Sequence, residues 1–321
     1  MEKHQPLMPA PEKVANHTPE NGQEVVKQRV RLFYDQVGWQ IEADGVYQNA
    51  RYEDLRPVSR EYVHRCHLRV NRHLRPKGKY FLDAGSGPVQ YIEYLTYSQG
   101  YSYRVCVDLS LVALLEARKR LENHALCVVA DVSCLPFSSD VFDSAVSLHT
   151  FHHLPLSEQP RAYQELVRVL APDAGAVVVN GWTESSLMRR FHWLVRLSEY
   201  IGQRFLRLRD KRGHYPERSK TNQAGSNPQK PAGTYIQKLD AAWLNANLGG
   251  KIPYRLYPWR SVSVRFLRAI VHRATGGVLF LRILYHLEER FPDYFAVHGQ
   301  YPMIVIQKNP TLKGKFHELD G

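Results

Sequence analysis

The sequence predicts an α/β fold: a seven-stranded, mostly parallel sheet whose last strand is antiparallel. Two observations carry this prediction. Between residues 79 and 180, short apolar runs alternate with stretches of helical periodicity, as in βαβ units with a parallel sheet. Near the C-terminus, apolar runs at 294–297 and 303–307 are joined by only five residues. So short a link requires an antiparallel hairpin.

The elements of this sheet follow in chain order. Strands are expected at 80–82, 103–107, 125–130, 141–148 and 175–180, before the closing hairpin. Helices are expected at 89–97, 109–121 and 158–170. The predicted core domain therefore consists of residues 79–182 and 291–310.

An N-terminal helical lid is expected at residues 24–78, after a polar tail at 1–23 that we interpret as disordered. Helical spacing at 23–37 and 58–74 indicates two helices. The aromatic group Phe33, Tyr34 and Trp39 lies in this N-terminal helical region. It either covers a ligand site or packs inward as the apolar face of a helix.

Residues 183–290 are expected to form a basic, helical cap inserted after the fifth strand. The amphipathic stretch 185–209 has apolar residues every three or four positions, and further helices are expected at 261–272 and 278–290. Residues 211–233 have the composition of a flexible loop. The cap has 20 Lys and Arg against 7 Asp and Glu, whereas the chain has 43 against 31. All the excess positive charge therefore lies in the cap.

Composition excludes several classes of protein. The four cysteines form no C-x-x-C pair, which favours free thiols in a reducing compartment. No apolar stretch approaches the roughly 18 residues of a membrane span. We therefore expect a cytoplasmic protein, either soluble or bound peripherally to a membrane.

The segment Asp83-Ala84-Gly85-Ser86-Gly87 is the strongest chemical signal. A strand that ends in an acid, followed by Gly-x-Gly and a helix, is typical of nucleotide-type turns, because glycines allow the ligand to approach backbone amides. The third glycine of a dinucleotide fingerprint is absent. The next two strands end at Asp108 and Asp131, and parallel strands bind ligands at their carboxyl edge. Asp108 is placed to accept hydrogen bonds from ribose hydroxyls.

Four stretches together resemble the class I, Rossmann-like S-adenosylmethionine methyltransferases. They are FLDAGSGPVQ (81–90), VCVDLS (105–110), VVADVSCLPFSSDVFDSAVSLHTFHHL (128–154) and ELVRVLAPDAGAVVVN (165–180). The sequence is most similar to the small-molecule type, as in ubiquinone and menaquinone biosynthesis. It departs from the family at Val89, where many members have a small residue.

The resemblance assigns cofactor-binding roles at matching positions. It implies that the turn, including Ser86, holds the methionine part of S-adenosylmethionine and that Asp108 holds the ribose. It also implies that Leu109, Asp131 and Val132 contact the adenine. Residues 147–149, which include Ser147, would line the methyl-transfer site. The family is generally metal-free at this place.

The histidines His149, His152 and His153 follow the fourth strand. Their spacing permits a metal site, but no carboxylate or cysteine clusters with them. His149 or His152 could act as a general base, since histidine titrates near neutral pH. The plainest interpretation is a loop packed under the cofactor. We expect no metal.

The expected activity is methyl transfer to a small, hydrophobic or lipid-like acceptor. The basic cap either packs over the substrate, contacts an anionic membrane or binds nucleic acid, in that order of preference. An RNA or protein methyltransferase that docks through the cap is the alternative. The sequence has neither a D/N-P-P-Y/F motif at the fourth strand nor a Pro-Cys nucleophile, which makes nucleic acid the weaker alternative.

Overall fold

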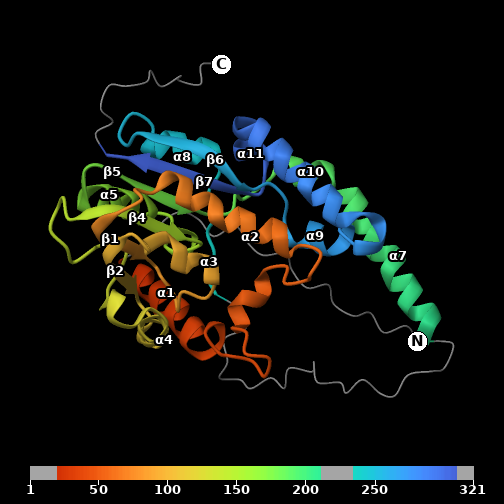
Figure 1. Cartoon of the computed structure of the whole chain (residues 1–321), viewed down its shortest axis with the longest axis horizontal. Helices are drawn as coiled ribbons and strands as arrows, with labels where there is room; N and C mark the ends of the chain where they lie inside the picture. Colours follow the sequence, from red (N-terminus) through yellow and green to blue (C-terminus); the bar gives the residue numbers. More distant parts are fainter. Residues whose placement is uncertain (1–19, 211–233, 309–321) are drawn as a thin grey trace, which may run out of the picture.

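Seven strands form one mixed sheet in the order β3-β2-β1-β4-β5-β7-β6 (Figure 1). The computed structural model describes residues 20–210 and 234–308. The strands are β1 (Gly78–Ala84), β2 (Tyr101–Asp108), β3 (Ala125–Val129), β4 (Phe142–Leu148), β5 (Leu170–Val179), β6 (Tyr254–Arg260) and β7 (Tyr301–Gln307). Strands β1 to β5 are parallel, and β7 runs antiparallel to both β5 and β6. The predicted fold class is confirmed.

Both faces of the sheet are covered, because successive residues of a strand point to opposite faces. Phe81 and Val177 belong to one apolar cluster, and their chain neighbours Leu82 and Val178 belong to the other. All four side chains are fully buried. Burial of each contributes about 1.5–3 kcal/mol to folding, so the central strands are rigid supports for whatever lies at their ends.

Helices α3 (Ile92–Leu95), α4 (Leu111–Leu121) and α5 (Gln159–Val169) follow β1, β2 and β4. The helix predicted at 89–97 is shorter than expected. Val89 has a left-handed φ of 53° and Tyr91 is extended, so the helix cannot begin before Ile92. The irregular stretch after the glycine turn lies beside the carboxyl end of β1.

The N-terminal part consists of α1 (Glu20–Phe33), a π-helical turn at Tyr34–Gly38 and α2 (Arg60–Leu68). The tail predicted at 1–23 is too long at its C-terminal end, because residues 20–23 already belong to α1. Residues 1–19 lie outside the described part of the chain.

The cap contains α6 (Ser186–Arg190), α7 (His192–Asp210), α8 (Ala241–Leu248), α9 (Val264–Ile270) and α10 (Gly277–Arg290). The single helix predicted at 185–209 is two helices that meet at Phe191. The helices predicted at 261–272 and 278–290 are separate, since Gly276 between them has a left-handed φ of 76°. The predicted loop at 211–233 lies outside the described residues. Within 20–210 and 234–308, no helix is long and apolar enough to cross a membrane.

The closing hairpin was wrongly predicted. Residues 294–297 do not form a strand but belong to helix α11 (Pro292–His298), which begins at a proline, a residue favoured in the first turn. The outer partner of β7 is instead β6, which comes from the segment predicted to be a purely helical cap. The predicted boundary between core and cap at residue 290 is therefore wrong as well.

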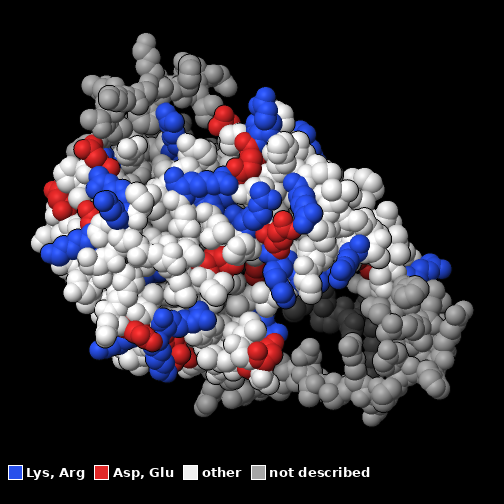
Figure 2. All heavy atoms as spheres, viewed as in Figure 1, with Lys and Arg blue, Asp and Glu red and all other residues white. Residues whose placement is uncertain are grey.

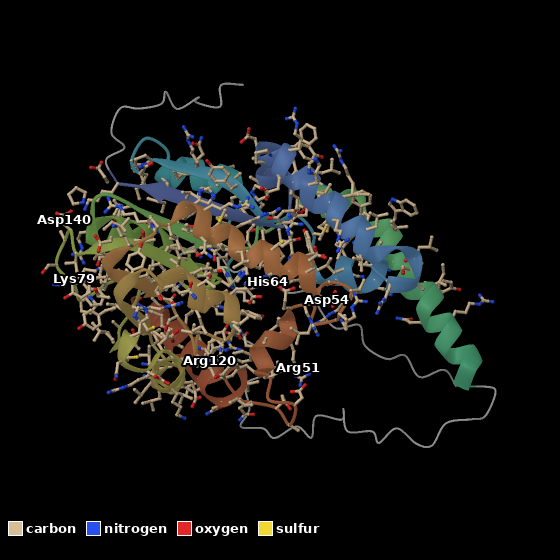
Figure 3. All side chains as sticks on the ribbon, in the orientation of Figure 1. Arg51, Asp54, His64, Lys79, Arg120 and Asp140 are labelled. Carbon is tan, nitrogen blue, oxygen red and sulfur yellow. The ribbon has the colours of Figure 1, made fainter. Side chains whose placement is uncertain are left out.

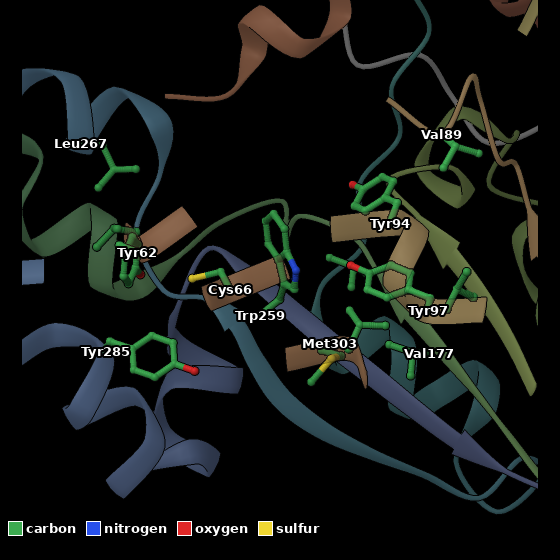
Figure 4. Packing of buried hydrophobic residues seen from close by; sticks show 14 of the residues in the cluster. Tyr62, Cys66, Val89, Tyr94, Tyr97, Val177, Trp259, Leu267, Tyr285 and Met303 are labelled. Atoms are coloured by element: carbon green, nitrogen blue, oxygen red, sulfur yellow. The ribbon is translucent and has the colours of Figure 1, made fainter. Parts of the chain in front are cut away.

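A buried polar cluster joins the cap to α2. The Glu288 carboxylate of α10 accepts hydrogen bonds from the Tyr62 hydroxyl (2.7 Å) and the Ser261 amide (2.9 Å), and it pairs with Arg69 at 2.9 Å. Figure 4 shows Tyr62 beside Cys66 and facing the cap helices. Because the cluster excludes water, losing one partner would leave a buried charge unpaired. Cap and lid are therefore held as one unit.

Figure 3 shows which end of the sheet carries the site. Lys79, at the start of β1, and Asp140, just before β4, lie at the end of the molecule farthest from α7. The carboxyl ends of the parallel strands therefore point toward the lid and the cap. Ligands of parallel α/β sheets bind at this edge.

Candidate functional site

A cavity of about 680 Å³ opens at the carboxyl ends of β1, β2 and β4 and is roofed by residues of the lid and the cap. It brings together nearly all the site residues predicted from the sequence: Asp83, Gly85, Ser86, Gly87, Asp108, Leu109, Asp131, Val132, His149 and His152. Ser147 does not line the cavity. Its hydroxyl is buried within the sheet and donates to the Ala84 carbonyl at 2.8 Å.

Neither glycine of the turn has room for a side chain. Gly85 has a φ of 77°, and a Cβ there would lie 2.2 Å from Cγ2 of Thr150. Gly87 has a φ of 52°, and a Cβ there would meet the Trp39 ring at 2.9 Å. Both the backbone conformation and the space therefore require glycine. The consequence is a bare backbone that a ligand in the cavity can approach.

Asp83 is held by a buried arginine. Nε and Nη2 of Arg104, from β2, donate to Oδ2 of Asp83 at 3.1 and 2.5 Å. Arg104 is fully buried, and the nearby carboxylate raises its pKa against the opposing effect of burial. The pair fixes Asp83 in one orientation through its Oδ2, and none of the hydrogen bonds among the described residues involves its Oδ1, which can accept from a ligand amine.

Asp108 ties the turn to β2. Its Oδ2 accepts from the Gly87 amide and its Oδ1 from the Ser110 amide, both at 2.9 Å. Burial raises the pKa of Asp108 to about 6. Each carboxylate oxygen has a second lone pair, so the side chain can still accept two hydroxyls. Hydroxyl donors would stabilise its ionised form.

Asp131 forms an ion pair with the lid. Its Oδ2 lies 2.6 Å from Nζ of Lys27 on α1, and the same ammonium lies 3.0 Å from Glu158. Its Oδ1 accepts from the amide and hydroxyl of Ser133. The carboxylate raises the pKa of Lys27. An ion pair therefore fastens α1 across the cavity end that Asp131 borders.

The aromatic segment after α1 also lies over the cavity. Tyr34 stacks on Trp39 with ring centroids 4.8 Å apart. The Tyr34 hydroxyl lies 2.8 Å from Nε2 of His153, whose Nδ1 faces the Tyr235 carbonyl at 2.7 Å. A carbonyl only accepts, so Nδ1 carries the proton and Nε2 accepts from tyrosine. Burial lowers the pKa of His153 to about 4, consistent with this neutral tautomer.

His149 and His152 differ in their partners. His149 has a left-handed φ of 57°, and its ring packs edge-on against Trp259 with centroids 5.0 Å apart. Burial lowers its pKa to about 3. Nδ1 of His152 lies 3.1 Å from Oδ1 of Asn180. Both imidazoles are therefore neutral near pH 7. Within the described residues, no group of three His, Cys, Asp or Glu is arranged to hold a metal ion.

The far end of the cavity was not predicted from the sequence. Its walls include the side chains Glu53, His67, Tyr91, Tyr94, Lys238, Trp259, Arg260 and Tyr301. Glu53 and Arg260 form a buried ion pair, and the Arg260 guanidinium lies over the Tyr301 ring at 4.6 Å. No motif marks these positions. The alternation of apolar and polar residues in β6, which ends in Trp259 and Arg260, was the one sequence signal that could have predicted a strand here.

A family model described as "Methyltransferase domain" matches residues 82–178. Residues 82–178 are therefore similar to a methyltransferase domain. The cofactor of such a domain is S-adenosylmethionine, and the matched stretch contains the glycine turn, Asp108 and Asp131.

Three known proteins are similar to this chain. "Probable tRNA methyltransferase 9B" of Mus musculus is 27% identical over 154 residues, which are 47% of this chain and 33% of that protein. The chain thus spans about a third of the length of this curated relative. A geranyl diphosphate C-methyltransferase from Streptomyces coelicolor A3(2) is 13% identical, with coverages of 89% and 97% and a TM-score of 0.47. The cyclase SpnF is 17% identical, with coverages of 84% and 85% and a TM-score of 0.43.

Proposed function

We propose that this protein is an S-adenosylmethionine-dependent methyltransferase that acts on a small, apolar acceptor. One observation carries the proposal: a single cavity joins the polar strand ends to a pocket of aromatic side chains. The first end suits a nucleoside with hydroxyl and amine groups, and the second suits a small molecule with an apolar body.

The cofactor end has a donor or acceptor for each polar part of the cofactor. Asp108 would accept the ribose hydroxyls, and Asp83 with the amides of the glycine turn would hold the methionine part. Leu109 and Val132 border the adenine position, and Asp131 would accept from the adenine amine beside Lys27. When bound, the cofactor supplies an electrophilic methyl group on a positively charged sulfur.

The acceptor end would orient the acceptor and exclude water. The rings of Trp259, Tyr301 and Tyr94 form apolar walls, and an in-line displacement gains most from such positioning. Both rings line the cavity, and His149 is the better general-base candidate because a hydrogen bond to Asn180 occupies one ring nitrogen of His152. The low pKa of about 3 limits the basicity of His149, so it fits acceptors whose proton leaves easily.

The acceptor class would be close to that of the ubiquinone and menaquinone methyltransferases. Support comes from the apolar lining and from stretches 81–90 and 128–154, on which the resemblance rests. The second candidate is RNA methylation. The similarity to a probable tRNA methyltransferase and the excess of Lys and Arg at 183–290 favour it.

A transfer assay with methyl-labelled cofactor separates the two candidates. The full chain is incubated with quinone precursors, phenols, isoprenoid lipids and total tRNA, in parallel with Asp108→Ala. Label transferred to one small-molecule class, and lost in the variant, supports the proposal. Label in tRNA alone supports the second candidate. If the full chain does not bind S-adenosylhomocysteine in calorimetry, both fail.

A further inference from the structure

The acceptor end of the cavity contains a lysine for which the described residues provide no counter-ion. Among the cavity's basic side chains, Lys27, Arg260 and Arg265 pair with carboxylates, and Arg31 is exposed. Lys238 is half-buried, and in the described part of the chain no acidic group lies within ion-pairing distance of its ammonium. An unpaired charge removed from water is costly.

Backbone hydrogen bonds hold Lys238 in this position. The Gln237 amide donates to the His152 carbonyl at 2.6 Å, and the Thr183 amide donates to the Leu239 carbonyl at 2.8 Å. The side chain of Lys238 extends past Gly181, so that its Nζ lies 3.3 Å from where a Cβ on that glycine would be. The ammonium is thus placed at the end of β5, in the wall of the cavity.

The surroundings of Lys238 are unfavourable for a lone cation. Its charge contributes to lowering the pKa of His149 and His152, and burial lowers its own pKa. The proposed cofactor would add a second positive charge to the same cavity. A negatively charged acceptor would offset part of this positive charge, whereas a neutral acceptor would not.

The geometry points to Lys238 as the subsite for an ionised acidic group of the methyl acceptor. The acceptor is then an anion with an apolar or aromatic body, its charge at Lys238 and its body against Trp259 and Tyr301. This inference rests on the proposed methyl transfer and narrows its substrate class.

A matched pair of fluorescent probes tests the subsite. 8-Anilinonaphthalene-1-sulfonate and uncharged N-phenyl-1-naphthylamine share an apolar body and differ in charge. They are titrated into the full chain saturated with S-adenosylhomocysteine. We expect the sulfonate to bind about tenfold more tightly. Lys238→Met should abolish this preference, Lys238→Arg should keep it, and the exposed Lys251→Met serves as the control.

The outcomes separate this inference from the proposed function. The inference would be overturned if the unaltered chain and Lys238→Met preferred the sulfonate probe equally, or if neither probe bound. S-adenosylhomocysteine affinity is measured in parallel and should not change in Lys238→Met. If that ligand does not bind the unaltered chain, the proposed function itself fails.

A second, independent observation concerns the outer surface of the cap. On α7, Trp193, Leu197, Tyr200 and Ile201 are all exposed, with Trp193 at 65%. Their spacing places them on one side of the helix. The opposite side faces α9, where the Ser198 hydroxyl donates to the Ala269 carbonyl. The apolar side of α7 is therefore uncovered by the described residues.

Helix α10 has a similar stripe. Leu279, Ile283 and Leu287 are exposed at positions four apart, with Leu279 at 63%. Figure 2 shows a broad uncharged area where Figure 1 places α10, with Lys and Arg side chains at its margin. Such patches on soluble proteins mark interaction sites.

We infer that these two stripes dock on an anionic lipid surface. Arg204 follows the α7 stripe and Arg290 ends the α10 stripe. Exposed aromatic and apolar residues flanked by arginine suit the boundary between headgroups and acyl chains. Helix α9 contacts α7 and also lines the cavity through Val264, so an acceptor dissolved in lipid would have a short route inward.

Vesicle cosedimentation tests the docking surface. The full chain should pellet with phosphatidylserine-containing vesicles and not with pure phosphatidylcholine. Trp193→Ser/Ile201→Ser and Leu279→Ser/Ile283→Ser should each reduce pelleting about tenfold, whereas the exposed Ile92→Ser, outside the cap, should not. Absence of pelleting, or a stable dimer in light scattering that the same substitutions dissociate, would overturn the inference.

Discussion

The two ends of the cavity are built in different ways. At the cofactor end, the ligand-facing groups come from three strand ends within 50 residues: 83–87, 108–109 and 131–132. At the acceptor end they come from the lid, the loop after β4 and the cap, with Glu53, His149, Lys238 and Trp259 far apart in the chain. The first end depends on local turns, whereas the second depends on how distant segments pack. We therefore expect substitutions at the two ends to affect different ligands.

Gly85→Val should have the largest effect. It combines a left-handed φ with a Cβ that lies 2.2 Å from Thr150, so the turn must move. We expect S-adenosylhomocysteine binding to fall below detection in calorimetry and the melting temperature to drop. Gly250→Val is the matched control, since its φ of 70° is similar but nothing lies within 4 Å of its Cβ. Similar losses in both variants would contradict the specific role of the turn.

The next largest effect should come from breaking the buried ion pair at either end of the cavity. Arg104→Met leaves Asp83 charged and unpaired, and Arg260→Met does the same to Glu53. Each should destabilise the protein by about 3–5 kcal/mol, measured by urea unfolding. Only Arg104→Met should also weaken S-adenosylhomocysteine binding. If Arg260→Met weakens it equally, the two ends do not function separately.

Asp108 provides a pH test of the cofactor end. Its pKa of about 6 lies above the ordinary value because of burial. Ribose hydroxyls bind the ionised form better, so S-adenosylhomocysteine affinity should rise from pH 5 to pH 7 and then level off. Asp108→Ala should weaken binding by roughly 1–3 kcal/mol and flatten this rise. Unchanged affinity in calorimetry would contradict the ribose assignment.

Lys27→Met should have the smallest effect. It removes the ion pair that joins α1 to Asp131, and we expect a loss of about 1 kcal/mol in cofactor affinity together with faster release. Lys119→Met breaks an exposed pair with Glu116 on α4 and is the control. Equal release rates in stopped-flow measurements would show that α1 does not restrain the ligand.

The contrast between local turns at the cofactor end and distant packing at the acceptor end explains which site residues the sequence could predict. The parallel strands and the acids at their ends follow from local alternation and turn chemistry, so Asp83, Asp108 and Asp131 were found at the cavity. Ser147 was misplaced, because alternation along β4 turns it away from the ligand.

The acceptor end could not be predicted in this way. His67 lies on α2 and Lys238 in an irregular segment, and only tertiary packing brings them to one wall. The strand at 254–260 was not predicted, because residues 294–297 were expected to be the partner of the last strand. A single sequence does not show which of two candidate segments completes a sheet edge.

Strand β6 also limits how the protein can be rebuilt. It is the outer neighbour of β7, and its last residues are cavity-lining Trp259 and Arg260. Replacing residues 183–290 with a short linker to change the acceptor would remove this strand along with the helices. β7 would then present an open hydrogen-bonding edge to other chains, a common cause of aggregation. Acceptor specificity is better redesigned by exchanging single wall residues than by exchanging the cap.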